Sequence, residues 1–297
     1  MDPFPPVSSE SHKSCEHDAT VIQRETTFRA PDGAELFRRS WRPAGPPRAV
    51  LVNVHGLGDH SGLYPTLPDH FVPRGWAVHA LDLRGNGRSS GQRGHIERWT
   101  VYRGDLGHFL HLVRAEEPDR PVFLLGHSLG GLVVLDFALE HPEGLRGVIA
   151  AAPPLGRVGT SSWLLALGRA VSRVWPTFTL ETGLDLSGLS RDPETRDAVL
   201  ADPLFHRRAS ARLAAELLAA AAGVRQRAER FPVPLLLLHG GADRMVMPDG
   251  TRAFFERVGQ PDKLHIEYPG AYHALFADLD RVRALGDLER WMLARTG

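Results

Sequence analysis

Short, continuously apolar runs separated by helix-like stretches constrain this fold more than any other feature of the sequence. Apolar residues fill most positions of each run instead of alternating with polar ones, which is typical of strands buried on both faces of a parallel sheet. The stretches between them, such as 102–116 and 131–140, carry apolar residues at helical spacing. This alternation predicts an α/β protein with a mostly parallel central sheet flanked by helices. The apolar runs lie at 49–56, 77–83, 121–128, 145–153, 234–243 and 263–270.

Two segments depart from this alternation. Residues 21–43 are predicted to form an antiparallel strand pair that turns at the Pro-Asp-Gly sequence of 31–33. Residues 154–230 contain helix-like pieces and no clear strand, and they are too long for a loop within a compact domain. We therefore expect a helical cap inserted into the sheet domain. The expected division is a flexible tail (1–20), a first core part (21–153), the cap (154–230) and a second core part (231–297).

The composition excludes several classes of protein. The chain has 35 Lys and Arg residues against 35 Asp and Glu residues, so no net field favours nucleic acid. The single cysteine, Cys15, cannot form an internal disulfide. No apolar run approaches the roughly 18 residues of a membrane-spanning helix, and the first residues lack the hydrophobic stretch of a signal peptide. We therefore expect a cytoplasmic protein that binds no nucleic acid.

Ser128 is the candidate nucleophile. It is the centre of a G-x-S-x-G pattern at 126–130, which is weak evidence alone because glycine and serine are common. Its setting strengthens it, because a strand-like run precedes the pattern and a helix-like stretch follows it. The sharp turn would present the hydroxyl near a helix N-terminus, whose dipole favours negative charge. The alternative is a glycine-rich turn in which the serine only caps the helix.

A serine hydroxyl becomes a good nucleophile only when a neighbouring base takes its proton. In this architecture the partners follow in the order Ser, Asp, His. Asp243 and His273 each come just after a predicted strand, at the carboxyl edge where open α/β sheets place their sites. His273 would act as base and then acid, while Asp243 would fix its tautomer. Structural roles fit the rival candidates Asp249, Asp278, His239 and His265 better.

The HGLGDH segment at 55–60 follows an early strand and supports two interpretations. In the first, the backbone N–H groups of Leu57 and Leu129 form an oxyanion hole. In the second, the segment is a zinc site of the H-x-H-x-D-H type, but Leu57 stands where a ligand histidine is needed. We therefore expect no metal and no cofactor, with a zinc-dependent hydrolase as the remote alternative.

Several segments together resemble the monoacylglycerol lipase and lysophospholipase branch of the α/β-hydrolases, from about residue 25 to the C-terminus. The resemblance implies a soluble or membrane-peripheral serine ester hydrolase that removes one fatty acyl group through an acyl-enzyme. It places the triad on Ser128, Asp243 and His273. The segments are HGLGDHSGLY (55–64), LDLRGNGRS (81–89), GHSLGG (126–131), LSRDPETRDAVLADPL (189–204), LLLLHGGADRMV (235–246) and YPGAYHALF (268–276).

The resemblance also implies a lipid ester as the small-molecule substrate. Many relatives have Glu at the position of Asp59 and Arg at that of Leu63, so the head group stays open between glycerol, glycerophosphate and a simple alcohol. Apolar residues at helical spacing in 161–175 indicate either a helix that buries one face or a lid that touches a membrane interface. The oligomeric state stays open. The expected substrate contacts are His55, Asp59, Leu63, Trp163, Leu167 and Val199.

Overall fold

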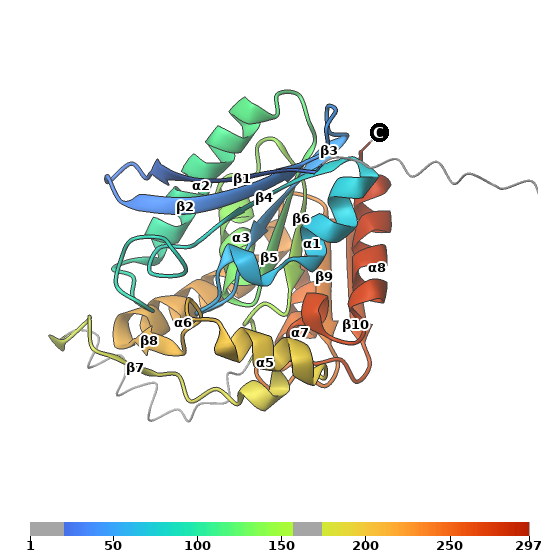
Figure 1. Cartoon of the computed structure of the whole chain (residues 1–297). Coiled ribbons are helices and arrows are strands. Elements are labelled where there is room, and N and C mark those ends of the chain that lie inside the picture. Colours follow the sequence, from blue (N-terminus) through green and yellow to red (C-terminus); the bar gives the residue numbers. More distant parts are fainter. Residues whose placement is uncertain (1–20, 157–173, 297) are drawn as a thin grey trace, which may run out of the picture.

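The computed structural model describes residues 21–156 and 174–296 (Figure 1). An eight-stranded sheet runs through its centre in the order β1-β2-β4-β3-β5-β6-β9-β10. The first two neighbouring pairs in this order are antiparallel and the remaining pairs are parallel. The mostly parallel sheet predicted from the apolar runs is therefore confirmed. The strands are β1 (Ile22–Arg29), β2 (Glu35–Arg42), β3 (Ala49–Val54), β4 (Trp76–Leu81), β5 (Val122–His127), β6 (Leu145–Ala151), β9 (Leu235–Gly240) and β10 (Lys263–Tyr268).

Helices cover both faces of this sheet (Figure 1). One face carries α2 (Trp99–Glu116), α3 (Leu129–Glu140), α6 (Ala211–Gln226) and α7 (Asp249–Arg257). The other face carries α1 (Thr66–Phe71) and α8 (Arg281–Leu293). Successive strand residues point to opposite faces. Leu124 therefore packs in the first layer and its neighbour Phe123 in the second. Because both layers are buried, both faces of the central strands β3, β4, β5, β6 and β9 are mostly apolar, which explains the continuous runs. Single 3-10 turns occur at Ser61–Leu63, Val72–Arg74, Leu186–Gly188, Ala228–Arg230 and Leu275–Ala277.

The antiparallel pair predicted for the first described residues is also confirmed. β1 pairs with β2 over its whole length. The turn between them contains Gly33 at φ 87°, a conformation that favours glycine. The Gly33 N–H donates to the Ala30 carbonyl, and the Asp32 carboxylate accepts from the Ala34 N–H.

The segment predicted as a cap contains more strand structure than expected. β7 (Thr179–Glu181) and β8 (Arg208–Ser210) form an antiparallel pair, so the expectation of no strand there is wrong. Strands of three residues are too short to produce a recognisable period in the sequence. Between them lies α5 (Pro193–Ala201), which is capped by the Asp192 carboxylate. The remaining part of the segment, 157–173, lies outside the described residues.

α6 packs differently from a cap helix. Its buried residues Leu213, Ala221 and Val224 belong to the same core layer as α2 and α3. The helix begins after Ser210, whose hydroxyl accepts from the Leu213 N–H. α6 therefore covers the sheet, and the part of 154–230 that lies outside the core layers ends near residue 210. Within the described ranges, no helix is long and apolar enough to cross a membrane.

Candidate active site

The three residues predicted to be catalytic lie at the carboxyl edge of the parallel strands. Ser128 directly follows β5, Asp243 follows β9 and His273 follows β10. Loops at this edge of an open sheet converge on one region. Ser128 and His273 line the same cavity, and Asp243 contacts His273 from behind.

The turn at Ser128 has the strained geometry expected of a nucleophile elbow. The serine adopts φ 53° and ψ −120°, and its N–H donates to the carbonyl of Ala151 on the next strand. Gly126 and Gly130, two positions on either side of Ser128, must be glycines because a side chain at either position would clash with the backbone. A Cβ at Gly126 would lie 2.2 Å from the carbonyl oxygen of Gly130, and one at Gly130 would lie 2.1 Å from that of Val54. Such backbone strain costs about 1–3 kcal/mol and is common at functional sites.

Asp243 is held by both carboxylate oxygens. Oδ2 lies 2.7 Å from Nδ1 of His273 and 3.2 Å from Nε2 of His239. Oδ1 accepts hydrogen bonds from the backbone N–H groups of Met245 and Val246 at 2.8 and 2.9 Å. Burial opposes the negative charge, but the nearby His273 and these hydrogen bonds outweigh it, so the pKa of Asp243 lies below its usual range. The group is a carboxylate over the whole working pH range.

His273 is only 3% exposed. Burial lowers the pKa of its imidazole below the usual range, and the charge of Asp243 opposes this effect. The ring is therefore neutral near pH 7, with the Nδ1 proton assigned to the bond with Asp243 and Nε2 free to accept. The structure has no hydrogen bond between Ser128 and His273, a contact that often tightens only when substrate binds.

Leu57 and Leu129, the predicted oxyanion-hole residues, line the same cavity. Leu57 lies in the loop after β3, and Leu129 opens α3, where helical N–H groups lack an intrahelical acceptor. Within the described residues neither N–H donates a hydrogen bond to another group of the protein. The loop of Leu57 approaches the serine closely, since a Cβ at Gly56 would lie 3.3 Å from Cβ of Ser128. An oxyanion formed beside Ser128 could accept from both groups.

The cavity above Ser128 is mostly apolar and encloses about 790 Å³ of empty space, part of it open to solvent. Much of its wall comes from the 182–189 and 205–207 segments, which the sequence analysis assigned to the cap. An apolar cavity of this kind suits a hydrocarbon chain better than a peptide. Its apolar wall residues include Leu184, Leu186, Leu189, Phe205, Leu217 and Val246.

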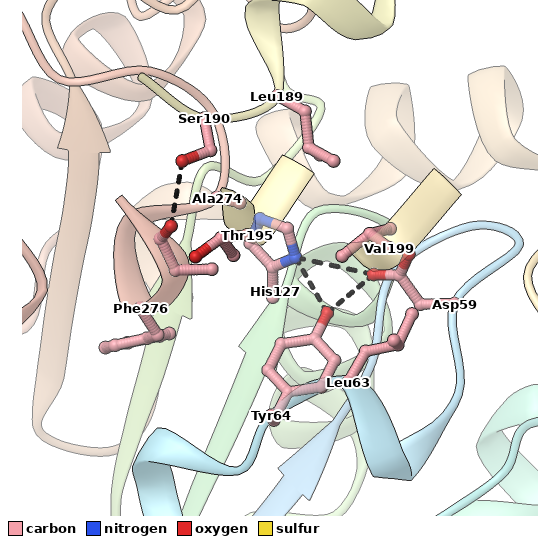
Figure 2. Close-up of a pocket in the computed structure, with 11 residues that line it drawn as sticks. Asp59, Leu63, Tyr64, His127, Leu189, Ser190, Thr195, Val199, Ala274 and Phe276 are labelled. Atoms are coloured by element: carbon pink, nitrogen blue, oxygen red, sulfur yellow. Dashed lines mark hydrogen bonds and ion pairs between the residues drawn. The ribbon is translucent and has the colours of Figure 1, made fainter. Parts of the chain in front are cut away.

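A second pocket adjoins the first, and Asp59, His127 and Leu189 border both (Figure 2). Three of the predicted substrate contacts, Asp59, Leu63 and Val199, line this second pocket. Leu63 comes from the loop after β3 and Val199 from α5. The polar groups at its base, Asp59, Tyr64 and His127, contact one another.

Residues 45–280 match a protein family described as serine aminopeptidase, S33. The chain belongs to this family. It is therefore a serine hydrolase, and the predicted α/β-hydrolase fold is confirmed. The chain is 32% identical to a monoacylglycerol lipase of Mycolicibacterium smegmatis, over 91% of this chain and 97% of that protein. It is 34% identical to a monoglyceride lipase of Rattus norvegicus, over 89% of this chain and 88% of that one.

Solved structures agree with this assignment. The monoacylglycerol lipase of Paleococcus ferrophilus superposes with a TM-score of 0.81 at 34% identity, covering 88% of this chain and 99% of that one. A monoglyceride lipase from Saccharomyces cerevisiae, at 23% identity, superposes with a TM-score of 0.82 over 92% of this chain and 95% of that one, which supports the fold alone. The resemblance inferred from the sequence motifs is therefore confirmed.

One predicted substrate contact of this serine hydrolase is wrong. His55 is fully buried and lines neither pocket. Its Nε2 accepts a hydrogen bond from the Leu83 N–H at 2.8 Å, and its Nδ1 lies 2.7 Å from the Gly56 carbonyl oxygen. His55 therefore supports the loop after β3 from within the protein. Two other predicted contacts, Trp163 and Leu167, lie outside the described residues.

The two histidines of the HGLGDH segment contact different partners. His60 Nδ1 accepts from the Gly62 N–H, and its Nε2 lies 3.2 Å from a carboxylate oxygen of Asp202. His55 is engaged separately with Leu83. Across 21–156 and 174–296, no group of three or more His, Cys, Asp or Glu side chains is arranged to hold a metal ion. The arrangement therefore does not support the zinc alternative.

Several polar contacts near the site were not predicted from sequence. Nε2 of His239 lies 3.2 Å from Oδ2 of Asp243, the oxygen that also contacts His273. Nδ1 of His239 lies 2.9 Å from the Thr251 hydroxyl. Tyr64 and His127 form a second set of contacts at the opposite side of His273. His127 is 63 positions from Tyr64 and 146 from His273, so no local pattern could have linked them.

Proposed function

We propose that this serine hydrolase cleaves the fatty acyl ester of a monoacylglycerol. The proposal depends on one arrangement: the strained Ser128 shares an apolar cavity with the base His273 and with two unpaired backbone N–H groups. Relatives named monoacylglycerol or monoglyceride lipase, 32–34% identical over about nine-tenths of the chain, support the substrate.

In the proposed mechanism Ser128 attacks the ester carbonyl while Nε2 of His273 accepts its proton. Asp243 keeps the other ring proton on Nδ1 and stabilises the imidazolium that forms. The N–H groups of Leu57 and Leu129 donate to the oxyanion of the tetrahedral intermediate. The alcohol leaves with the proton from His273, and water hydrolyses the acyl-enzyme by the same steps. No metal or cofactor takes part.

We assign the acyl chain to the apolar cavity above Ser128 and the alcohol to the adjoining pocket at Asp59. Asp59 and His127 border both spaces, so an ester seated at Ser128 could extend into each. In the alcohol pocket Leu63 and Val199 supply apolar wall, and Asp59 supplies a carboxylate that can accept from a hydroxyl. Ser190 and Thr195 also line this pocket, so the two free hydroxyls of a monoacylglycerol could contact the Asp59 carboxylate and one of these side-chain hydroxyls.

We further propose that the cap segment, from 154 to about 210, contacts a lipid surface peripherally. Four large apolar side chains are exposed on its described part, where they could enter the interface of a lipid surface. Such a contact would let an insoluble ester pass directly into the apolar cavity. The exposed side chains are Val174 (88%), Trp175 (60%), Leu180 (60%) and Leu200 (44%).

A lysophospholipid is the second candidate substrate, and Arg207 favours it. This exposed arginine lines the apolar cavity, and its only ion pair among the described residues is a 3.5 Å contact with Glu181. A phosphate on the substrate could compete for that guanidinium. A broad carboxylesterase activity would require neither Arg207 nor the alcohol pocket.

A kinetic panel separates these candidates. Monoacylglycerols, lysophospholipids, diacylglycerols and p-nitrophenyl esters are compared by kcat/KM, with Ser128→Ala as the inactive reference. We expect the highest kcat/KM with a monoacylglycerol, and we expect Ser128→Ala to lose both hydrolysis and fluorophosphonate labelling while its circular dichroism is retained. A preference confined to acetyl and butyryl esters would contradict the lipase proposal, and an active Ser128→Ala would contradict the serine mechanism.

A further inference from the structure

The hydroxyl of Tyr64 is a meeting point of three groups from different parts of the site (Figure 2). It accepts a hydrogen bond from the Gly56 N–H at 3.1 Å and lies 2.7 Å from Oδ2 of Asp59. Nδ1 of His127 lies 2.9 Å away, and the other ring nitrogen of His127 lies 3.2 Å from the carbonyl oxygen of His273. Tyr64 and His127 are both buried.

These contacts join the two loops that the chemistry depends on. Gly56 precedes Leu57, whose N–H we assign to the oxyanion hole. His127 precedes the nucleophile in β5, and through its ring it holds the backbone of the loop that carries His273. One buried chain of hydrogen bonds thus runs from the oxyanion loop to the loop of the base.

The directions of three contacts in this chain follow from the chemistry of its members. The carboxylate of Asp59 can only accept, so the Tyr64 hydroxyl donates its single proton to it, and the Gly56 N–H donates to the phenol oxygen. The carbonyl of His273 can only accept, so Nε2 of His127 donates to it.

The surroundings match these directions. Nδ1 of His127 lies 3.9 Å from Oδ2 of Asp59, so the ring has a carboxylate beside it. Burial opposes that carboxylate, but the hydrogen bond and charge of His127 outweigh it and hold the pKa of Asp59 below its usual range. Burial and the charge of Asp59 raise the pKa of the Tyr64 phenol well above its usual range, so it remains a proton donor.

We propose that Tyr64, through His127, is a positioning residue that holds the oxyanion loop and the loop of His273 in a fixed relation. The proposal rests on the roles in ester hydrolysis proposed above for Ser128 and His273. Neither Tyr64 nor His127 touches the reacting ester bond, and neither exchanges a proton with it. Their effect is to keep the N–H of Leu57 and the base at the separation that the tetrahedral intermediate requires.

His127 also acts on the base electrostatically. Its ring centroid lies 4.8 Å from that of His273. Three titratable side chains surround His273: Asp243, His239 and His127. Asp243 favours the imidazolium of His273, whereas positive charge on His127 disfavours it. Removing that charge should therefore raise the pKa of His273 and move the acid limb of kcat/KM to higher pH.

The test compares Tyr64→Phe and His127→Gln with a matched buried tyrosine. Tyr268→Phe is the control, because the Tyr268 hydroxyl is also buried but donates to Asp287 of α8, away from the site. Each variant is measured for kcat and KM with a p-nitrophenyl ester, for the rate of fluorophosphonate labelling and for thermal stability. We expect Tyr64→Phe and His127→Gln to lower kcat about 10–100-fold with little change in KM, as small misplacements of reacting groups do.

Two further results distinguish positioning from a general loss of stability. The double variant Tyr64→Phe/His127→Gln should lose little more kcat than the stronger single variant, because both remove the same chain of contacts. His127→Gln should move the acid limb of the kcat/KM profile to higher pH. Tyr268→Phe should leave that profile unchanged and lower only the melting temperature.

The proposal is overturned if both site variants keep kcat within about twofold of wild type and behave like Tyr268→Phe. Should Tyr64→Phe fail to fold, the kcat and pH profile of His127→Gln decide alone. A wild type that hydrolyses p-nitrophenyl esters but no monoacylglycerol would contradict the proposed substrate and leave this test valid. A wild type that neither labels nor hydrolyses any ester would overturn both proposals.

Discussion

Replacing Asp243 with asparagine tests the orienting acid through its hydrogen bonds. In the carboxylate, Oδ1 accepts from two backbone N–H groups, those of Met245 and Val246, and Oδ2 accepts from His273. An asparagine has one accepting oxygen. If its amide nitrogen took the Oδ1 position, two buried N–H groups would lose their acceptor, at about 1–3 kcal/mol each. The oxygen therefore stays at Oδ1, and the NH₂ group faces His273.

His273 must then accept at Nδ1, which moves its own proton to Nε2. This is the nitrogen that has to take the proton of Ser128, so the ring can no longer act as base. Fixing this wrong tautomer costs about 10⁴ in kcat in a Ser-His-Asp enzyme, or about 5.4 kcal/mol in the barrier. His273 is buried, so water cannot readily replace the lost orientation. We therefore expect Asp243→Asn to lose about 10³–10⁴ in kcat with its fold intact.

The assay is steady-state hydrolysis of a p-nitrophenyl ester near pH 7.5, with fluorophosphonate labelling as an independent readout and thermal melting as the check on folding. Asp249→Asn is the matched control, because Asp249 is an exposed aspartate at the start of α7 and was the nearest rival in sequence. It should keep kcat within about twofold of wild type. An Asp243→Asn enzyme within about tenfold of wild type, or a larger loss in Asp249→Asn, would refute the tautomer argument.

Three further predictions address other parts of the site. Because burial lowers the pKa of His273, the base stays neutral down to below pH 6.5, and the acid limb of kcat/KM should lie below that value; a limb above it would contradict this. Gly130→Ala puts a Cβ 2.1 Å from the Val54 carbonyl and should cost about 3 kcal/mol or more in urea unfolding. Gly104→Ala, with open space around it, should instead add about 0.5–1 kcal/mol, and equal effects would refute the crowding argument. Prolonged chelation should leave ester hydrolysis unchanged, and lost activity that zinc restores would revive the metal interpretation of 55–60.

The strands and the loops that follow them were predictable because burial on both faces leaves a direct trace in the sequence. β5 is apolar at Val122, Phe123, Leu124 and Leu125, since alternate side chains enter different core layers. Once the sheet is known to be parallel, residues just after its strands must gather at one edge. Local sequence was therefore sufficient to propose Ser128 and its partners.

Features that depend on distant packing were not predictable in the same way. α6 was assigned to the cap because an amphipathic helix has the same spacing whether it covers a sheet or a lid. Its place in the core layer depends on contacts of α6, whose Ala221 and Val224 are buried, with α2 and α3, which lie about a hundred residues earlier in the chain. His55 was misplaced for a related reason, because adjacency to the oxyanion loop does not reveal that its side chain turns inward to the Leu83 N–H.

His127, the last residue of β5, and Ser128, which directly follows it, place both the nucleophile and the loop that carries the base. Ser128 is held at φ 53° by its N–H bond to Ala151 and by the tight contacts of its flanking glycines. His127, in regular strand geometry, directs its ring to the backbone of His273. The nucleophile and the anchor of its base are thus covalent neighbours, so the strand and its following turn fix their separation. A substitution in the cavity wall at Leu184 or Leu186, far from this turn in the chain, should therefore alter KM and acyl preference more than the rate of the chemical step.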